Sequence, residues 1–307
     1  MRTHNTISLQ FIIAICLAFG TNQVAAQESA PTPVTTPSVA QTIPASNTLL
    51  TTSHPDPENL KQAQTANVRK SETVRPTSES LEVEVGYSYD YLTNGFAPWQ
   101  SAHLFVGKRF ASRQSLYGIY RETQRVRQRD REAMIGFYQP LNRRWAVLVE
   151  GNGSPTHRIL AKWSALAQVE RNFGKGWIGS AGFRRTVFNT AQVNTGTFDA
   201  QRYFSRYRAA YTLYLSGLKG AGTSASHRGQ LNYYYGEQSS TLGISFAAGR
   251  ELENLGPRIL QTSVRSFGVQ GRHWLSSRWG VNYDALLHIQ GDIYTRKGFS
   301  VGLRYRF

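Results

Sequence analysis

The stretch GFSVGLRYRF, Gly298–Phe307, places a large apolar side chain at every second position and ends on phenylalanine. Glycine, serine and two arginines occupy the positions between them. Because a β-strand sends successive side chains to opposite faces, this stretch predicts a strand with one apolar face and one cationic face. Such a strand is typical of a wall that separates lipid from a polar lumen.

The same alternation recurs along the chain from Leu81 onward. LEVEVGYSYDYL (81–92) and WGVNYDALLHIQ (279–290) each gather apolar side chains on one face. Repeated runs of about ten residues, separated by turns, indicate an all-β fold, a transmembrane antiparallel up-and-down β-barrel. We predict fourteen strands, with twelve as the alternative because two segments alternate poorly; the expected ranges are 81–92, 99–110, 115–125, 131–139, 145–152, 160–173, 177–187, 195–204, 206–218, 225–236, 240–250, 260–274, 279–290 and 297–307.

The segments before the barrel have a different composition. Residues 1–26 predict a secretory signal peptide, with a short apolar core at Phe11–Phe19 and cleavage after Ala26. Cys16, the single cysteine, lies in that core, so the mature chain is expected to lack disulfides and thiolate metal sites. Residues 27–80 are rich in Pro, Thr and Ser and predict a disordered periplasmic segment, with a plug or a peptidoglycan-associated arm as the alternative. The barrel is expected to span 81–307.

Aromatic residues and cations recur together at the strand ends. KRF (108–110), RNF (171–173) and RYF (202–204) each place a cation two residues before Phe, on the same face. Aromatic rings at one level, with cations reaching toward head groups, form an interfacial girdle. The pattern also predicts short turns and both ends of the barrel on the periplasmic side. The tryptophans expected in the girdle are Trp145, Trp177, Trp274 and Trp279.

The C-terminal aromatics add a partner to the prediction. Tyr305 and Phe307 lie on the lipid-facing side of the last expected strand. A terminal aromatic of this kind resembles the signal that the outer-membrane barrel-assembly machinery reads. An all-β sandwich would explain the alternation, but not the girdle, the signal peptide and the terminal Phe together.

The net charge of +16 is carried by the barrel segment, which has 30 Lys and Arg against 14 Asp and Glu. A nucleic-acid partner is not expected, because the cations alternate along strands instead of clustering on one surface. Arginines around the loop near residue 126 are expected to contact lipopolysaccharide phosphates. The arginines predicted to point inward, where they would favour an anionic permeant, are Arg109, Arg208, Arg304 and Arg306.

A second interpretation of the inward arginines has equal weight. Buried cations need partners, so carboxylates such as Glu82 and Glu84 would neutralise them and leave the lumen without a net field. Another charged group, Arg250, Glu251 and Glu253, is expected at the outer rim. An ion-pair cluster is the prediction for that group, with a saccharide or divalent-cation site as the alternative.

Five short motifs together resemble the YaiO family of outer-membrane β-barrels. The resemblance covers roughly 81–307 and implies an outer-membrane barrel of a family often linked to envelope polysaccharide. It supplies no catalytic residues. The motifs that carry it are LNYYYGE (231–237), GRELE (249–253), GRHWL (271–275), QGDIYTRKG (290–298) and GLRYRF (302–307).

Catalytic motifs are not found in the sequence. G-x-S-x-G, H-E-x-x-H, the P-loop and the Ca²⁺ loop do not occur. Asp284 and His288 share a strand face but lie about 13 Å apart, so we expect His288 to be a hydrogen-bonding lumen residue. The protein is therefore predicted not to be an enzyme and to need no cofactor or metal.

The expected function is an envelope conduit or scaffold associated with polysaccharide secretion, integral to the outer membrane of a Gram-negative bacterium. The expected partners are outer-membrane lipid, lipopolysaccharide, the assembly machinery and an anionic polysaccharide. An outer-membrane enzyme that modifies lipid or lipopolysaccharide is the first alternative. A surface receptor is the second, and short outer loops disfavour it.

Overall fold

The structure of the chain is a computed structural model. It describes residues 79–125, 127–219, 222–236, 240–254 and 259–307. The predicted signal peptide and nearly all of the predicted disordered segment lie outside these residues. In the described part of the chain, no helix is long and apolar enough to cross a membrane.

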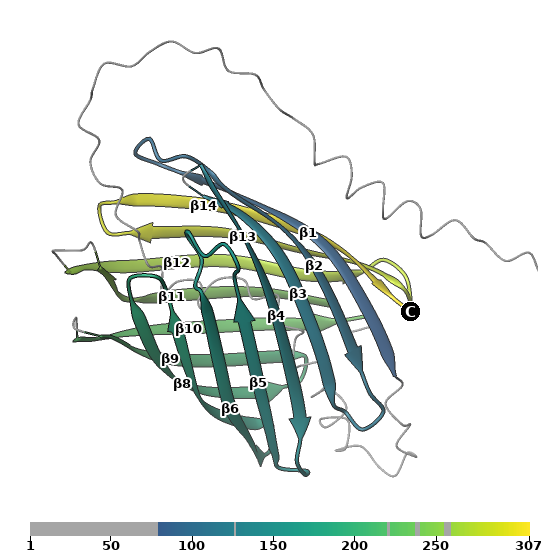
Figure 1. Cartoon of the computed structure of the whole chain (residues 1–307). Coiled ribbons are helices and arrows are strands. Elements are labelled where there is room, and N and C mark those ends of the chain that lie inside the picture. The colour runs from purple at the N-terminus through teal and green to yellow at the C-terminus, as the bar shows by residue number, and fades with distance from the viewer. Residues whose placement is uncertain (1–78, 126, 220–221, 237–239, 255–258) are drawn as a thin grey trace, which may run out of the picture. The chain divides into compact units, whose positions relative to one another are not determined.

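Fourteen antiparallel strands form a closed barrel in which each strand pairs with its neighbours in sequence, and β1 pairs with β14 (Figure 1). The predicted strand number is therefore confirmed, and the alternative of twelve is wrong. Closure leaves no unpaired strand edge, as a membrane interior requires. The strands are β1 (Ser80–Leu92), β2 (Trp99–Arg109), β3 (Ser115–Arg125), β4 (Gln128–Pro140), β5 (Trp145–Gly153), β6 (Trp163–Gly174), β7 (Trp177–Val187), β8 (Gln192–Phe204), β9 (Tyr207–Leu218), β10 (Gly222–Tyr235), β11 (Ser240–Asn254), β12 (Ile259–Trp274), β13 (Trp279–Gln290) and β14 (Tyr294–Arg306).

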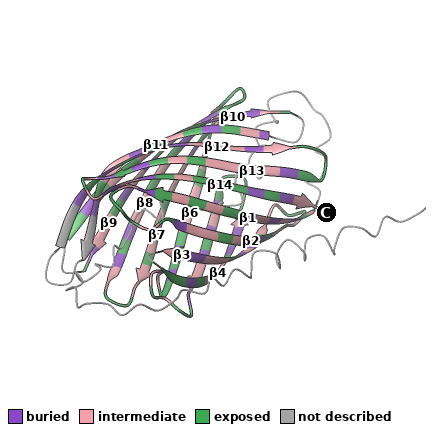
Figure 2. Ribbon diagram, turned by 90° about the horizontal axis from the view of Figure 1, so that it is seen from above, coloured by how far each residue is buried: buried purple, intermediate pink, exposed green. Residues whose placement is uncertain are grey.

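Buried and exposed residues alternate along the strands (Figure 2). On β1, Glu82 and Glu84 are buried, whereas Tyr87 and Tyr89 are more than 40 % exposed. An apolar residue on the outside of a barrel is solvated by lipid, so its exposure costs nothing there. The inward face is thus the polar one, and the outward face meets the membrane.

Several strands extend farther than the apolar pattern predicts, all at the end of the barrel opposite the C-terminus. β4 begins at Gln128 instead of 131, β10 at Gly222 instead of 225, and β14 at Tyr294 instead of 297. β11 continues to Asn254 instead of ending at 250. Backbone pairing continues beyond the lipid level, where apolar alternation is no longer required. We call this end of the barrel the loop rim.

The opposite end, where β14 finishes, is called here the C-terminal rim. Its connections are short, and Lys175 and Ser205 adopt left-handed backbone conformations (φ 51° and 52°) that reverse the chain tightly. Each C-terminal-rim turn that the structure describes from end to end carries at least one cation. These cations are Arg113, Arg143, Arg144, Lys175, Arg206 and Arg278.

Candidate functional site

All four arginines predicted to line the lumen lie on inward-facing positions. Arg304 is 1 % exposed and Arg208 is 9 % exposed, so both are buried inside the wall. Arg109 and Arg306 lie near the C-terminal rim and are partly buried. The alternation of side chains along each strand therefore predicted the facing of these residues correctly. Their effect on the charge of the lumen depends on the residues that they contact.

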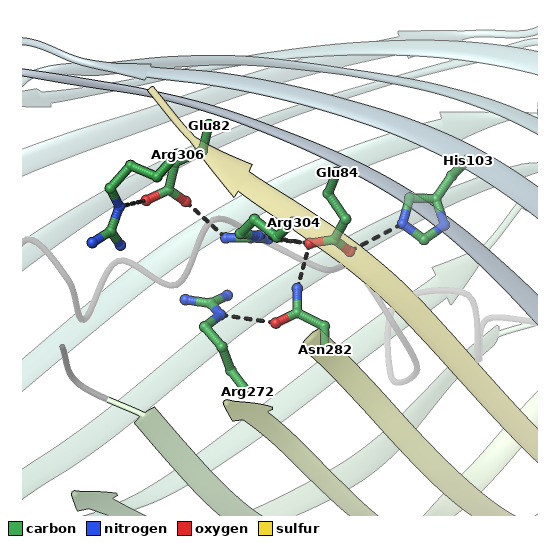
Figure 3. Close-up of polar contacts among 7 residues, drawn as sticks. All are labelled: Glu82, Glu84, His103, Arg272, Asn282, Arg304 and Arg306. Carbon is green, nitrogen blue, oxygen red and sulfur yellow. Dashed lines mark hydrogen bonds and ion pairs between the residues drawn. The ribbon is translucent and has the colours of Figure 1, made fainter. Parts of the chain in front are cut away.

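Arg304 and Arg306 are held by two glutamates of β1, the strand that closes the barrel against β14 (Figure 3). Arg304 Nε donates to Glu84 Oε2 at 2.7 Å, and its Nη1 donates to Glu82 Oε2 at 3.0 Å. Arg306 Nε donates to Glu82 Oε1 at 2.8 Å. We call these four residues the seam cluster. Their direct pairing across the closing strands is the second of the two interpretations drawn from the sequence.

Neighbouring strands extend the seam cluster on both sides (Figure 3). His103 Nε2 lies 3.3 Å from Glu84 Oε1, and the Asn282 amide also donates to Glu84. Arg272 Nε donates to the Asn282 side-chain oxygen at 3.0 Å. Phe105 and Trp274 cover the two β14 guanidiniums, with Arg304 Cζ 5.0 Å and Arg306 Cζ 3.8 Å from the respective ring centroids. The charges are thus enclosed by hydrogen bonds and aromatic faces.

Two glycines make room for the seam cluster. Gly86 and Gly302 face each other across the β1–β14 pair. A Cβ at Gly86 would come within 2.2 Å of His103 Cε1, and a Cβ at Gly302 within 2.6 Å of Glu84 Oε1. A larger residue at Gly302 would displace Glu84 of the seam cluster, and one at Gly86 would displace His103, which contacts Glu84.

Gly302→Ala is therefore expected to destabilise the barrel by about 1–3 kcal/mol, the usual cost of overpacking a well-filled site. The measurement is the temperature at which the folded band disappears in detergent gels. Gly229→Ala is the matched control, because a Cβ at Gly229 would meet nothing within 4 Å. Equal loss of stability in both variants would contradict the steric role of Gly302.

A second group of inward charges lies on the wall formed by β3 to β7. Arg184 Nη2 donates to Glu150 Oε2 at 2.7 Å, and the Tyr117 hydroxyl donates to the other oxygen of Glu150. Tyr138 donates to Glu170 Oε1 at 3.3 Å. These contacts join strands two apart along the wall. The alternation of side chains predicts that Glu150 and Arg184 face inward. It does not predict which residues on strands two apart contact each other.

Inward-facing arginines and inward-facing carboxylates are equal in number in the described part of the barrel. Opposite charges that lie together cancel the field that either would produce alone. Among the side chains that the structure describes, the net positive charge therefore lies on the rims and the outward face. The inward arginines are Arg109, Arg121, Arg125, Arg184, Arg208, Arg228, Arg272, Arg296, Arg304 and Arg306, and the inward carboxylates are Glu82, Glu84, Asp90, Asp130, Glu132, Glu150, Glu170, Asp199, Glu251 and Asp284.

The outer-rim candidates are arranged differently from the prediction. β11 continues through them, so Arg250 and Glu251 point to opposite faces of a strand and cannot pair with each other. Arg250 is exposed, whereas Glu251 is 1 % exposed and accepts a hydrogen bond from Gln290 Nε2 at 3.1 Å. Glu253 lies on the same strand, and its side chain is outside the described residues. The ion-pair cluster predicted for Arg250, Glu251 and Glu253 therefore contains no Arg250–Glu251 pair, and the part that involves Glu253 stays a prediction.

Three of the four predicted girdle tryptophans lie on the outward face. Trp145, Trp177 and Trp279 are 38 %, 45 % and 36 % exposed. Arg171 Cζ lies 5.0 Å from the Trp145 ring centroid, and Arg202 Cζ lies 5.1 Å from that of Trp177. The cation–aromatic pairs expected from the strand ends are thus present at one level of the barrel.

Trp274 does not belong to the girdle. It is seven residues from Phe267, which is 48 % exposed on the outside of β12, so the odd separation turns Trp274 inward. There it packs against Arg306 of the seam cluster. Its position at the end of a strand suggested an interfacial role, whereas its parity with Phe267 would have indicated the lumen.

The C-terminal aromatics pack edge to face on the outward face. The centroid of the Tyr305 ring lies 4.7 Å from the ring centroids of both Trp279 and Phe307. Phe307 is 63 % exposed, and its backbone N–H donates to the Leu81 carbonyl at 2.9 Å. The last residue thus completes the ladder between the first and last strands while its ring points to lipid.

His288 is a hydrogen-bonding residue of the lumen wall, as expected. It is 1 % exposed, with Nδ1 2.8 Å from Ser266 Oγ and Nε2 3.1 Å from Gln290 Oε1. The amide of Gln290 continues the chain to Glu251. Among the described residues, no group of three or more His, Cys, Asp or Glu side chains is arranged to hold a metal ion.

Comparison with protein-family models gives one match, to the YaiO membrane beta barrel domain over residues 81–254. This match covers more than half of the chain. The chain belongs to the YaiO family. It is an integral outer-membrane β-barrel protein, and two of the motifs that suggested the family, at 231–237 and 249–253, fall within the matched residues. The motifs after 270 lie beyond them.

Solved structures similar to this YaiO barrel include two porins and a secretin, all of low sequence identity. No curated protein sequence matches the chain. Three of the similar structures are the "KdgM porin" (11 % identity, 73 % of this chain and 99 % of that chain, TM-score 0.44), an anion-selective porin from Comamonas acidovorans (9 %, 75 % and 99 %, 0.46) and a bacterial polysaccharide outer membrane secretin (12 %, 76 % and 99 %, 0.46).

Proposed function

We propose that this YaiO-family barrel is an outer-membrane conduit or scaffold that serves the export of a polysaccharide. The observation that carries the proposal is the composition of the lumen wall. Equal numbers of inward arginines and carboxylates leave amide, hydroxyl and aromatic side chains to define its surface. Such groups bind and release polyhydroxylated chains without the strong trapping that a net charge would cause.

The partners of this role follow from the outer surface. Arg129 and Arg131 lie on the outward face near the loop rim, where both contact Glu122 at 3.1 Å. Two cations on one carboxylate leave a net positive charge at the level of lipopolysaccharide phosphates. We also propose that the terminal aromatics are recognised by the barrel-assembly machinery, and that the C-terminal rim faces the periplasm.

Planar-bilayer conductance of the refolded barrel tests the conduit. If the lumen is charge-balanced, the reversal potential in a salt gradient should lie near zero, so cations and anions should pass almost equally. Strong selectivity for either ion would contradict the balanced lumen. Absence of conductance would remove the conduit and leave the scaffold.

Variants that remove one charge predict the sign of the change in ion selectivity. Arg109→Gln should shift the reversal potential toward cation preference, because it removes a cation that is only partly buried in the lumen. Glu170→Gln should shift it toward anion preference by the same argument. Arg304 and Arg306 are unsuitable for this purpose because their removal also breaks the seam cluster. Shifts of the same sign in both variants would rule out a lumenal origin.

Membrane location has its own test. The protein should fractionate with outer membranes and migrate faster unheated than boiled in detergent gels, because a closed sheet resists detergent unfolding. Recovery in the soluble periplasmic fraction would contradict the location and the orientation together.

A further inference from the structure

We propose that the outward face of the barrel carries a docking site for the phosphorylated head group of lipopolysaccharide, formed by Arg250, Arg265 and Lys297. These three residues, here called the cation arc, come from β11, β12 and β14. The proposal deepens the expected contact with lipopolysaccharide by assigning it a site on the side of the barrel formed by these strands. It rests on the proposed orientation, in which the C-terminal rim faces the periplasm and the loop rim lies at the outer leaflet.

The three cations lie at one level of the barrel. Arg250 is ten residues after the start of β11 at the C-terminal rim, and Arg265 and Lys297 are nine residues before the ends of β12 and β14 at that rim. Ten residues of extended chain span about 33 Å, which is about 25 Å along the axis of a barrel whose strands tilt by about 40°. The apolar band of an outer-membrane barrel is about 25 Å tall. The cations therefore lie where that band ends and lipid head groups begin.

Strand pairing brings the three side chains to one region of the outward face. Arg250 is paired with Ser263, and Arg265 lies two residues farther along β12 on the same face, so the two arginines are diagonal neighbours. A single strand, β13, separates Arg265 from Lys297. Adjacent strands are about 4.8 Å apart, so the cation arc is about 14 Å wide. Long cationic side chains across this width can contact two phosphates at opposite ends of a disaccharide.

The cation arc has no compensating carboxylate among the described residues. Arg250, Arg265 and Lys297 are exposed, and their side chains form no hydrogen bond or ion pair with another described residue. In the part of the chain that the structure describes, β10 to β14 and β1 present no outward carboxylate. Asp292 lies in the turn between β13 and β14, where it is exposed to solvent and forms no ion pair with a described residue. The positive charge of the arc is thus available to an anionic ligand.

Outward arginines elsewhere near the loop rim differ from the cation arc because they already have partners. Arg129 and Arg131 share the carboxylate of Glu122, at 3.1 Å each. Arg185 Nη2 donates to Gln192 Oε1 at 3.0 Å. The two guanidiniums of the arc keep their donors for the oxygens of a phosphate, which the planar guanidinium binds with two parallel hydrogen bonds.

An apolar surface suited to acyl chains lies next to the cation arc, on its C-terminal-rim side. There the next outward residues after Arg265 and Lys297 are Phe267 and Phe299, which are 48 % and 55 % exposed. Phe246, 57 % exposed, lies on the same side of Arg250. A lipid that carries phosphates above several acyl chains matches this order of cations above phenylalanines. The combination favours lipopolysaccharide over a soluble anion or an acidic protein.

Native mass spectrometry of the refolded full-length protein in detergent tests the cation arc. The probes are lipid A, which carries two phosphates on a glucosamine disaccharide, and cardiolipin, which carries two phosphates on glycerol. Lipid A should bind at a lower concentration than cardiolipin, because its phosphates are held at opposite ends of a rigid head group. Arg265→Gln should weaken the binding of lipid A about tenfold, as expected for the loss of charge-assisted hydrogen bonds.

Arg228→Gln is the control, because it removes the same charge from the inward face of β10, which lipid does not reach. It should bind lipid A as the unmodified protein does, and gel shifts on heating should show that both variants are folded. Failure of lipid A to bind, equal binding of cardiolipin, or equal loss in both variants would overturn the proposal. Conductance without preference for lipid A would remove this site alone, whereas preference for lipid A without conductance would remove the conduit alone.

Discussion

Replacing Arg304 by glutamine is expected to lower the free energy of unfolding of the barrel by about 3–5 kcal/mol, the usual cost of breaking a buried ion pair. Arg304 is 1 % exposed and contacts both Glu82 and Glu84. Its removal leaves Glu84 with His103 and Asn282 as its side-chain hydrogen-bond partners among the described residues, and it leaves Glu82 paired with Arg306. The measurement is denaturant unfolding of the refolded barrel, followed by tryptophan fluorescence.

A charge-neutral double variant separates the ion pair from its hydrogen bonds. Glu84→Gln combined with Arg304→Gln removes one charge of each sign, so no uncompensated charge remains at that position. It should recover most of the stability that Arg304→Gln loses. If the double variant is as unstable as the single one, packing at the seam matters more than charge, and the electrostatic account of the cluster is wrong.

Deleting Phe307 is expected to reduce the amount of assembled barrel severalfold. The deletion removes both the backbone hydrogen bond to Leu81 and the ring that stacks on Tyr305. Both contacts lie where the first and last strands join, the step that closes the sheet. The measurement is the fraction of membrane-inserted, heat-modifiable protein after expression.

Phe173 provides a stringent comparison for Phe307. It is the second-last residue of β6, on the outward face, and has the same exposed fraction, 63 %. Phe173→Asp and Phe307→Asp therefore change lipid contact equally, whereas only the second alters the terminal strand. We expect a much larger loss of assembly for Phe307→Asp, and equal losses would show that position in the chain is unimportant.

Alternation of apolar residues was sufficient to predict the barrel, its strand number and the facing of most side chains. The prediction succeeded because lipid requires an apolar side chain at every outward position within the membrane. The apolar alternation is therefore repeated in strand after strand. Inward facing of Arg109, Arg208, Arg304 and Arg306 followed from the same parity. The girdle cations were predictable because each lies two residues from its Phe.

Two predictions relied on position near a strand end instead of on side-chain parity, and both differ from the structure. Trp274 was placed by its position at a strand end, although the pattern of its own strand turns it inward. The predicted strand ended at Arg250, with Glu251 beyond it at the outer rim, because apolar alternation stops near them. Strand pairing continues above the lipid level, where any polar residue is acceptable, so the sequence gives no signal for its end.

Contacts between strands could not be predicted in detail. Glu150 meets Arg184 and Tyr117 because barrel closure sets the relative height of second-neighbour strands. Register depends on the whole circuit of fourteen strands, and no local segment encodes it.

The cations of the C-terminal rim have a consequence for how the barrel sits in its membrane. We expect the Lys and Arg residues of the described C-terminal-rim turns to interact with lipid phosphates. Tilting the barrel would push some of these residues into hydrocarbon and lift others into water. We therefore expect these cations to resist tilting, so that the barrel axis stays near the membrane normal and both ends of the barrel stay at a constant depth in the bilayer.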